Sequence, residues 1–321
     1  MADVLVRSSA SLTELSTGRR FKNSAMTVAV YSAFALALIP LIWLSITVVT
    51  RGIDRFFVDS NGEHNFNLDF LTQSMRGISG GMPEGGILHA IWGTLLITLT
   101  ASIISVPIGL MTAVYLVEYG SGRLKRAITF FVDVMTGIPS IVAGLFAYAL
   151  ASVLIGPGTK TGFVGAIALS VLMTPVVVRA SEEMLKLVPN ELREASYALG
   201  VPKWRTITKV VLRTAFAGLT TGVTLAIARV IGETAPLLIA VGFADSMNLN
   251  IFDGRMMTLP VYIVSEWRKG PAVCNDPTVP CVPEITEMRA WAAALVLIVI
   301  VMALNLIARL ISKYFSPKTG R

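Results

Sequence analysis

The sequence contains few charged residues and very little histidine or cysteine. Only 15% of its 321 residues are Asp, Glu, Lys or Arg, whereas 54% are apolar, and the mean hydropathy is +0.70. A soluble domain usually has about 25% charged residues, so this composition indicates an integral membrane protein. With two histidines, His64 and His89, and two cysteines far from them in sequence, the chain offers no ligand set for a metal.

Motifs for nucleotide and nucleic-acid binding are also missing. Residues 155–162, IGPGTKTG, lack the Gly-x4-Gly-Lys pattern of a phosphate-cradling loop. We therefore expect no ATP site, no cofactor and no enzyme activity in this chain. The net charge of +7 is divided among separate segments without an aromatic stacking platform, which argues against nucleic acid as a partner. No Ala-x-Ala site follows the first apolar run, so that run is interpreted as a retained signal anchor.

Six apolar runs are long enough to cross a bilayer, which predicts an all-α membrane protein with six transmembrane helices. They cover residues 25–49, 87–117, 130–154, 163–178, 214–243 and 290–311, and the fourth is extended toward Leu185. Lys and Arg number four before the first run, three between the second and third, seven between the fourth and fifth, and four at the C-terminal end. The positive-inside rule therefore predicts that both termini are cytoplasmic in a multi-pass cell-membrane protein.

This topology divides the chain into a cytoplasmic tail, a transmembrane domain and a second cytoplasmic tail. The three parts are residues 1–24, 25–315 and 316–321, with a cytoplasmic loop at 186–213 and extracytoplasmic loops at 51–86 and 244–288. The extracytoplasmic loops offer a surface for a soluble binding protein, and residues 256–267 are apolar enough for an interfacial or re-entrant helix. Cys274 and Cys281 both lie outside, where a small local disulfide is favoured over a metal site.

The cytoplasmic loop at 186–213 contains a charged, helix-forming segment. Asn190 is expected to cap a first helix, with Glu191 in its first turn. Gly200 is expected to end that helix in the left-handed conformation, and Pro202 to open a second. A narrow face of small and apolar residues follows the first helix: Leu192, Ala195, Ser196 and Leu199. We interpret the segment, including Glu191, as a docking site for a separate motor protein; an ordinary amphipathic surface loop is the alternative.

Glu194, Ala195 and Ser196, with Gly200 after three further residues, resemble the EAA loop of ABC importer permeases. The chain departs from the family pattern at Ser196, where the family has a second Ala, and at Arg213, where it has Pro. The resemblance implies the type I importer permease fold with six transmembrane helices. It also implies that these four residues belong to a coupling helix that sits in a cleft of the ATPase subunit.

Two charged residues lie inside the fifth apolar run. Arg229 is roughly 20 Å into the run at about 1.5 Å per residue, where an ionised side chain costs about 2.5–3.5 kcal/mol. Glu233 follows one helical turn later, so a structural ion pair is one explanation. The other is function, because a guanidinium suits a tetrahedral oxyanion and a carboxylate limits how tightly it is held. Gly232 and Pro236 weaken the helix here, and we expect it to bend.

Residues 228–238, ARVIGETAPLL, are similar to the fifth span of phosphate-specific importer permeases, and their Ala-Pro-Leu-Leu ending resembles the A-type subunit. Further similarities lie at residues 106–109 and 137–142. The resemblance covers most of residues 85–315. It implies a heterodimeric pore with a C-type permease, two copies of an ATPase that binds ATP and Mg, an extracytoplasmic phosphate-binding protein, and phosphate as the substrate. The expected pathway residues are Arg229, Glu233, Thr234 and Asp133.

Several residues in the second to fourth runs allow two interpretations. Asp133 is expected to pair with Arg229 across the bundle or to reach the membrane interface. Three prolines are expected to interrupt the second, third and fourth runs, as gates or as kinks that serve packing: Pro107, Pro139 and Pro175. A stripe of small residues in the third run permits close helix contact: Gly137, Ser140 and Gly144.

Alternatives from other functional classes remain open. Another oxyanion, such as sulfate or molybdate, fits the same charges as phosphate. An ion-coupled secondary carrier also explains a buried Arg and Glu, but such folds usually show internal repeats, and the sequence has no convincing duplication. A membrane scaffold or sensor does not require charges at membrane depth in the fifth run.

Overall fold

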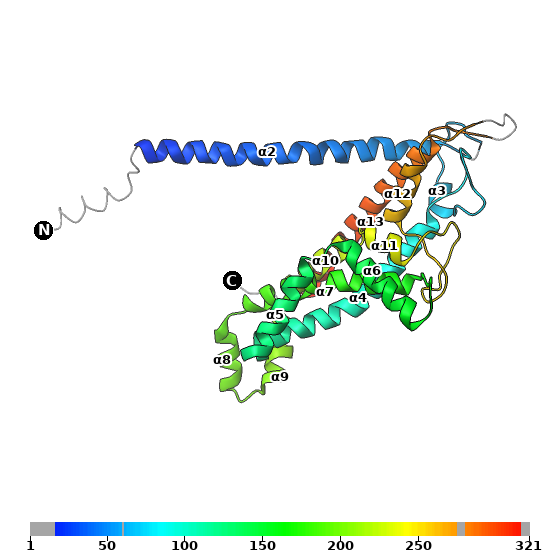
Figure 1. Ribbon diagram of the computed structural model, residues 1–321. Helices are drawn as coiled ribbons and strands as arrows, with labels where there is room; N and C mark the ends of the chain where they lie inside the picture. Colours follow the sequence, from blue (N-terminus) through cyan, green and yellow to red (C-terminus); the bar gives the residue numbers. More distant parts are fainter. Residues whose placement is uncertain (1–16, 60, 275–279, 316–321) are drawn as a thin grey trace. The chain divides into compact units, whose positions relative to one another are not determined.

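The fold is a bundle of helices joined by loops (Figure 1). A computed structural model describes residues 17–59, 61–274 and 280–315, and every regular element in these ranges is helical. The longer helices are α2 (Thr17–Asp54), α4 (Leu88–Val114), α5 (Gly122–Thr136), α6 (Ser140–Leu154), α7 (Gly162–Lys186), α8 (Asn190–Ala198), α10 (Leu212–Val230), α12 (Leu259–Lys269) and α13 (Ile285–Phe315). The shorter ones are η1 (Arg55–Phe57), α3 (Asp69–Thr72), η2 (Tyr115–Tyr119), α9 (Lys203–Thr206), η3 (Ile207–Val211) and α11 (Ala235–Ala240).

Five helices are long and apolar enough to cross a bilayer, and a sixth span results if α5 and α6 are counted together. These two helices are bent by 106° at a short break, where Pro139 was expected to interrupt the third apolar run. Gly137 ends α5, its N–H bonding to the carbonyl of Val134 at 3.0 Å. Pro139 then keeps Ile138 out of the helical conformation and precedes the first residue of α6.

The first helix belongs mainly to a unit of its own, residues 1–50, while residues 51–321 form a second unit. Helix α2 begins at Thr17, so residues 17–24 are helical and continuous with the first apolar run. Basic residues in this first part, including Arg19 and Lys22, can extend a helix beyond the hydrocarbon because their charged ends reach the interface. Apolar side chains farther along α2, such as Trp43 at 72% exposed, form the kind of surface that lipid covers.

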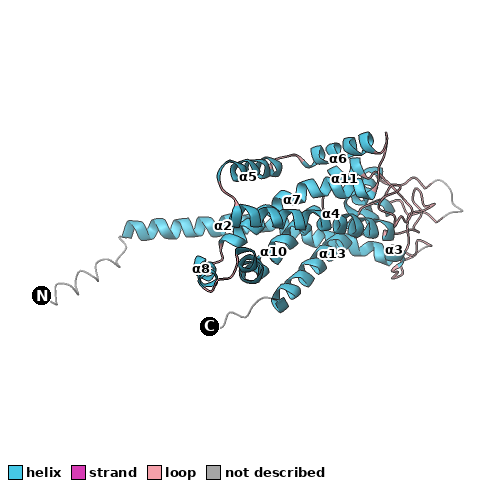
Figure 2. Ribbon diagram, turned by 90° about the horizontal axis from the view of Figure 1, so that it is seen from below, coloured by secondary structure: helices cyan, strands magenta, loops and turns pink. Residues whose placement is uncertain are grey.

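The core of the second unit lies where α4, α7 and α10 pack together (Figure 2). Small residues make this close packing possible. A Cβ on Gly109 of α4 would lie 2.7 Å from Val177 Cγ1, and one on Gly222 of α10 would lie 2.7 Å from Ala180 Cβ. Membrane helices gain contact area in this way, since lipid provides no hydrophobic force between them.

Helices α4 and α7 continue through Pro107 and Pro175, so these prolines do not break their helices, and their role as gates or packing kinks stays a prediction. A proline deletes one backbone hydrogen bond, and neighbouring helices can compensate for that loss in a packed bundle. Pro175 and Met173, two residues before it, are buried where α7 packs against its neighbours. Only Pro139, which follows Gly137, coincides with a helix break among the three.

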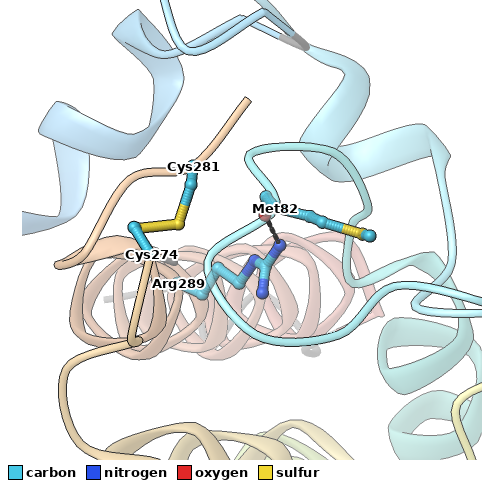
Figure 3. The surroundings of a disulfide bond; sticks show 4 residues. All are labelled: Met82, Cys274, Cys281 and Arg289. Carbon is cyan, nitrogen blue, oxygen red and sulfur yellow. Dashed lines mark hydrogen bonds between the residues drawn. A yellow bond between two sulfur atoms is a disulfide. The ribbon is translucent and has the colours of Figure 1, made fainter. Parts of the chain in front are cut away.

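Two buried arginines organise the loop that precedes α4. Arg289 donates to the carbonyls of Met82 at 2.5 Å and Glu84 at 2.6 Å, while Arg55 donates to those of Pro83 at 2.7 Å and Gly85 at 3.3 Å. Four successive carbonyls therefore have arginine partners. Cys274 and Cys281 form a disulfide beside this loop, as Figure 3 shows, and Val282 donates to the Gly81 carbonyl at 2.8 Å.

Helix α12 overlaps residues 256–267, the stretch expected to form an interfacial or re-entrant helix. Leu259, Val261 and Tyr262 are buried, and the helix packs on α13 and α4. Gly93 of α4 leaves no room for a Cβ beside the Met257 carbonyl, which lets the start of this segment approach α4 closely. The first part of the segment thus belongs to the protein core, whereas its end at Trp267 is exposed.

Candidate coupling and transport sites

The fifth apolar run is divided in two at the residues expected to line a pathway. Helix α10 ends at Val230, and α11 begins at Ala235. The intervening turn is held by bonds from Ile231 N to Ile227 O at 3.0 Å and from Glu233 N to Val230 O at 3.1 Å. Pro236 cannot donate a backbone hydrogen bond, so it belongs in the first turn of a new helix. We expected the helix to bend at this position, and in the structure it is interrupted completely.

Along the chain, Arg229 precedes the end of α10 and Glu233 follows it. Arg229 is exposed in its last turn, whereas Glu233 and Thr234 are half-buried in the break. Within the described part of the chain, neither charged side chain takes part in an ion pair, so the one-turn pairing is not formed. The helix ends between them, which removes the spacing that such a pair needs. A Cβ on Gly232 would meet no atom within 4 Å, so the turn borders open space.

The break is anchored to α6 by a close backbone contact. A Cβ on Gly144 would lie 2.6 Å from the Cα of Pro236 and 2.8 Å from its carbonyl oxygen. Glycine is therefore required at position 144 for α11 to reach α6, which is the close contact that the small-residue stripe predicts. Two features far apart in the sequence, the stripe in the third run and the proline in the fifth, lie together.

Asp133 pairs with Arg179 of α7, so the expected pairing with Arg229 is wrong. Arg179 also donates to Glu182 at 2.8 Å, and Glu182 accepts from Lys186 at 2.7 Å. The Glu182 side chain is only 6% exposed, whereas that of Asp133 is 58% exposed. This chain of four alternating charges ties α5 to the last two turns of α7.

The loop at residues 186–213, called the coupling loop here, consists of two helical arms around Gly200. Gly200 has a φ of +72°, the left-handed conformation that favours glycine, and Gly200 and Val201 donate to the carbonyls of Tyr197 and Ser196. Asn190 is the first residue of α8 and makes no capping bond, so its expected capping role is wrong. Its side-chain oxygen accepts from Arg193 at 3.2 Å instead.

On α8, part of the face of small residues packs between the two arms of the coupling loop, and the rest is exposed to solvent. Ser196 is buried, and its hydroxyl lies 2.8 Å from that of Thr206 in α9. The expectation that Ser196 faces a partner is therefore wrong, because its hydroxyl joins the arms. Glu191, Glu194 and Ala195 are exposed and available for contact.

Arg193 fastens the coupling loop to the transmembrane helices. Its guanidinium donates to Glu118 of η2 at 2.9 and 3.0 Å, and to the carbonyls of Leu185 at 3.0 Å and Val188 at 2.6 Å. Lys203, in the second arm, donates to the backbone carbonyl of Glu118 at 2.5 Å. Both arms therefore bind η2, the turn that follows α4, and Arg193 also binds the end of α7 through Leu185.

The main residues of these contacts were not predicted from the sequence, among them Glu118, Arg179 and Arg193. Arg179 has a partial local signal, since Glu182 follows at a spacing that permits an ion pair on a helix. Glu118 and Arg193 are 75 positions apart. Only the packing of α4 beside α7 brings them together, so nothing in their local sequence identifies the pair.

Comparisons with known proteins identify the family. Residues 105–321 match the family described as binding-protein-dependent transport system inner membrane component. Phosphate transport system permease protein PstA 1 of Mycobacterium tuberculosis (strain CDC 1551 / Oshkosh) is 47% identical over 298 residues, which cover 92% of this chain and 90% of that protein. The protein PstA of Pasteurella multocida (strain Pm70) is 36% identical over 295 residues, covering 91% and 95% respectively.

Solved structures share the fold at low sequence identity. A chain of a bacterial alginate ABC transporter, in complex with an alginate pentasaccharide-bound periplasmic protein, has a TM-score of 0.60 at 12% identity and covers 96% of this chain and 100% of its own. A chain of the inward-facing MetNI methionine ABC transporter has a TM-score of 0.54 at 19% identity, covering 72% and 96%. This multi-pass inner membrane protein therefore belongs to the family of binding-protein-dependent transport system inner membrane components, in the branch of the PstA permease proteins.

Proposed function

We propose that this chain forms half of the transmembrane pathway of an ATP-driven importer for inorganic phosphate. The observation that carries the proposal is the 47% identity, over 92% of the chain, to a phosphate transport system permease of Mycobacterium tuberculosis. Other oxyanions and an ion-coupled carrier are not favoured by these relatives. The chain does no covalent chemistry in this proposal, and a separate ATPase supplies the energy.

The partners follow from this role. A C-type phosphate permease completes the pore, two ATPase copies bind ATP and Mg, and a phosphate-binding protein delivers the substrate from outside. The exposed residues Glu191, Glu194 and Ala195 of α8 contact the ATPase, and Gly200 fixes the angle between the two arms. Both termini then lie in the cytoplasm, on the side of the coupling loop.

The mechanism is alternating access. Closure of the ATPase dimer on ATP moves α8, and the bonds from Arg193 and Lys203 transmit the movement to the ends of α4 and α7. Helix α10 packs on α7, so the break that separates α10 from α11 changes its position relative to α6. Phosphate passes Arg229, whose permanent charge attracts it, while Glu233 prevents tight retention. Hydrolysis then resets the pathway.

The test is uptake of labelled phosphate in cells that lack their own high-affinity phosphate importer. We expect uptake when this chain is produced with its C-type permease, ATPase and binding protein, and no uptake when this chain alone is omitted. Unlabelled phosphate should compete, and equimolar sulfate or molybdate should not. Competition by sulfate or molybdate, or uptake that survives removal of the ATPase, would overturn the proposal.

A further inference from the structure

An apolar groove of about 420 Å³ lies between the end of α4 and the second arm of the coupling loop. Met111, Val114 and Tyr115 contribute to one wall, and Trp204, Ile207 and Leu212 to the other. Both walls contain a π-helical turn, η2 at Tyr115–Tyr119 and η3 at Ile207–Val211. Such turns are rare and recur at functional sites, and two of them face one groove here.

A basic hollow of about 550 Å³ adjoins the groove and shares Thr208 and Leu212 with it. Lys209 and Arg213 line this hollow and are exposed. Neither forms an ion pair with any residue in the described ranges. The carboxylate of Glu118 on η2 is already bound by Arg193, so it does not neutralise them. An apolar slot thus opens directly beside two positive charges that have no ion-pair partner in the part of the chain that the structure describes.

The side chains around the groove place it at the boundary between hydrocarbon and headgroups. Met111 is 72% exposed on the lipid-type surface of α4, and the next turns carry Tyr115 and Tyr119. Trp204, on the opposite wall, is 57% exposed. Tyrosine and tryptophan concentrate at membrane interfaces because their rings are amphipathic. The positively charged loop that contains Trp204 indicates that this interface is the cytoplasmic one.

We propose that this groove binds an anionic phospholipid of the cytoplasmic leaflet. One acyl chain lies in the apolar groove, and Lys209 and Arg213 bind the phosphate of the headgroup. Basic pockets between transmembrane helices on the cytoplasmic side suit such headgroups, and charge-assisted hydrogen bonds to phosphate are strong. A soluble anion would leave the groove unfilled, whereas an apolar helix would leave both cations unpaired. The inference does not depend on which substrate the protein transports.

The test is native mass spectrometry of the intact transporter complex, purified from membranes that contain phosphatidylglycerol and phosphatidylcholine. We expect the wild-type complex to retain phosphatidylglycerol in preference to phosphatidylcholine. The double variant Lys209→Gln/Arg213→Gln should lose this preference, with about 25-fold weaker binding if each basic residue contributes about fivefold. A matched control, Arg123→Gln/Arg126→Gln, removes two exposed positive charges from the cytoplasmic start of α5 and should retain the lipid.

A groove-filling variant tests the other half of the site. Met111→Trp adds bulk at an exposed position of the wall, and it should lower the amount of bound phosphatidylglycerol without loss of assembly. The proposal is overturned if the Lys209→Gln/Arg213→Gln complex retains as much phosphatidylglycerol as wild type, or if the Arg123→Gln/Arg126→Gln control loses it equally. It is also overturned if Met111→Trp releases another subunit while the bound lipid is unchanged, because the groove would then be a protein interface.

Discussion

Charged residues at the coupling loop and at the break in the fifth run are held in different ways. Arg193 binds the carboxylate of Glu118 and several backbone carbonyls, and Arg179 bridges Asp133 and Glu182. By contrast, Arg229 and Glu233 have no ion-pair partner within the described ranges. A guanidinium whose donors are occupied holds helices together, whereas one without a partner can act on a ligand. This difference agrees with the proposed function, in which the first region transmits movement and the second contacts the substrate.

Replacing the unpaired arginine should have the largest effect on transport. Arg229→Ala removes the positive charge beside the break, and we expect loss of phosphate uptake with normal amounts of assembled complex. Arg229→Lys keeps the charge but not the planar donors, so partial uptake should remain. Uptake of labelled phosphate, normalised to complex in the membrane, measures both. Normal uptake with Arg229→Ala would show that transport does not depend on substrate contact in this region.

Breaking the tie of the coupling loop should have the largest effect on stability. Arg193→Met leaves Glu118, whose side chain is 5% exposed, without its charged partner, at a cost of about 3–5 kcal/mol. The double variant Arg193→Met/Glu118→Leu should recover most of this loss, because no charge remains unpaired. Thermal unfolding of the purified complex compares the three proteins. Equal destabilisation by the single and double variants would show that packing, and not charge pairing, fixes the loop.

A change at the turn of the coupling loop should have an intermediate effect. Gly200→Ala places a Cβ on a residue with a φ of +72°, which costs about 1–2 kcal/mol. We expect a smaller fraction of ATPase to co-purify with the complex. Gly200→Asn is the matched variant, since asparagine tolerates this conformation better. The interpretation fails if alanine and asparagine have the same effect.

The smallest effect is expected at the exposed end of the charge chain between α5 and α7. Asp133→Asn removes one partner of Arg179, which keeps Glu182, and the side chain of Asp133 is 58% exposed. Such pairs contribute about 0.2–1 kcal/mol. Glu182→Gln should cost more because Glu182 is buried and bound by both Arg179 and Lys186. We expect a lower unfolding midpoint for Glu182→Gln than for Asp133→Asn. The reverse order would contradict the argument from burial.

Much of the fold could be predicted because apolar runs and helix-breaking residues act locally. Gly200 and the break between Ile231 and Thr234 were predictable, since glycine conformation and the missing N–H of Pro236 are properties of single residues. In the apolar run at residues 130–154 the expected interruption at Pro139 is present, as a bend of 106° between α5 and α6, but nothing in the local sequence distinguished this proline from the other two. Pro139 broke that run, whereas Pro107 and Pro175 did not, because a proline can be accommodated when the surrounding helices pack closely.

The sequence alone determined that this is a helical membrane protein with a charged loop of two helical arms and charges at the depth of its fifth apolar run. Only the tertiary structure decided which charges are paired. Asp133 binds Arg179 instead of Arg229, and Glu118 binds Arg193 across 75 positions. The physical reason is that ion pairing depends on distances of a few ångströms between side chains, and those distances are set by how α4, α5 and α7 pack.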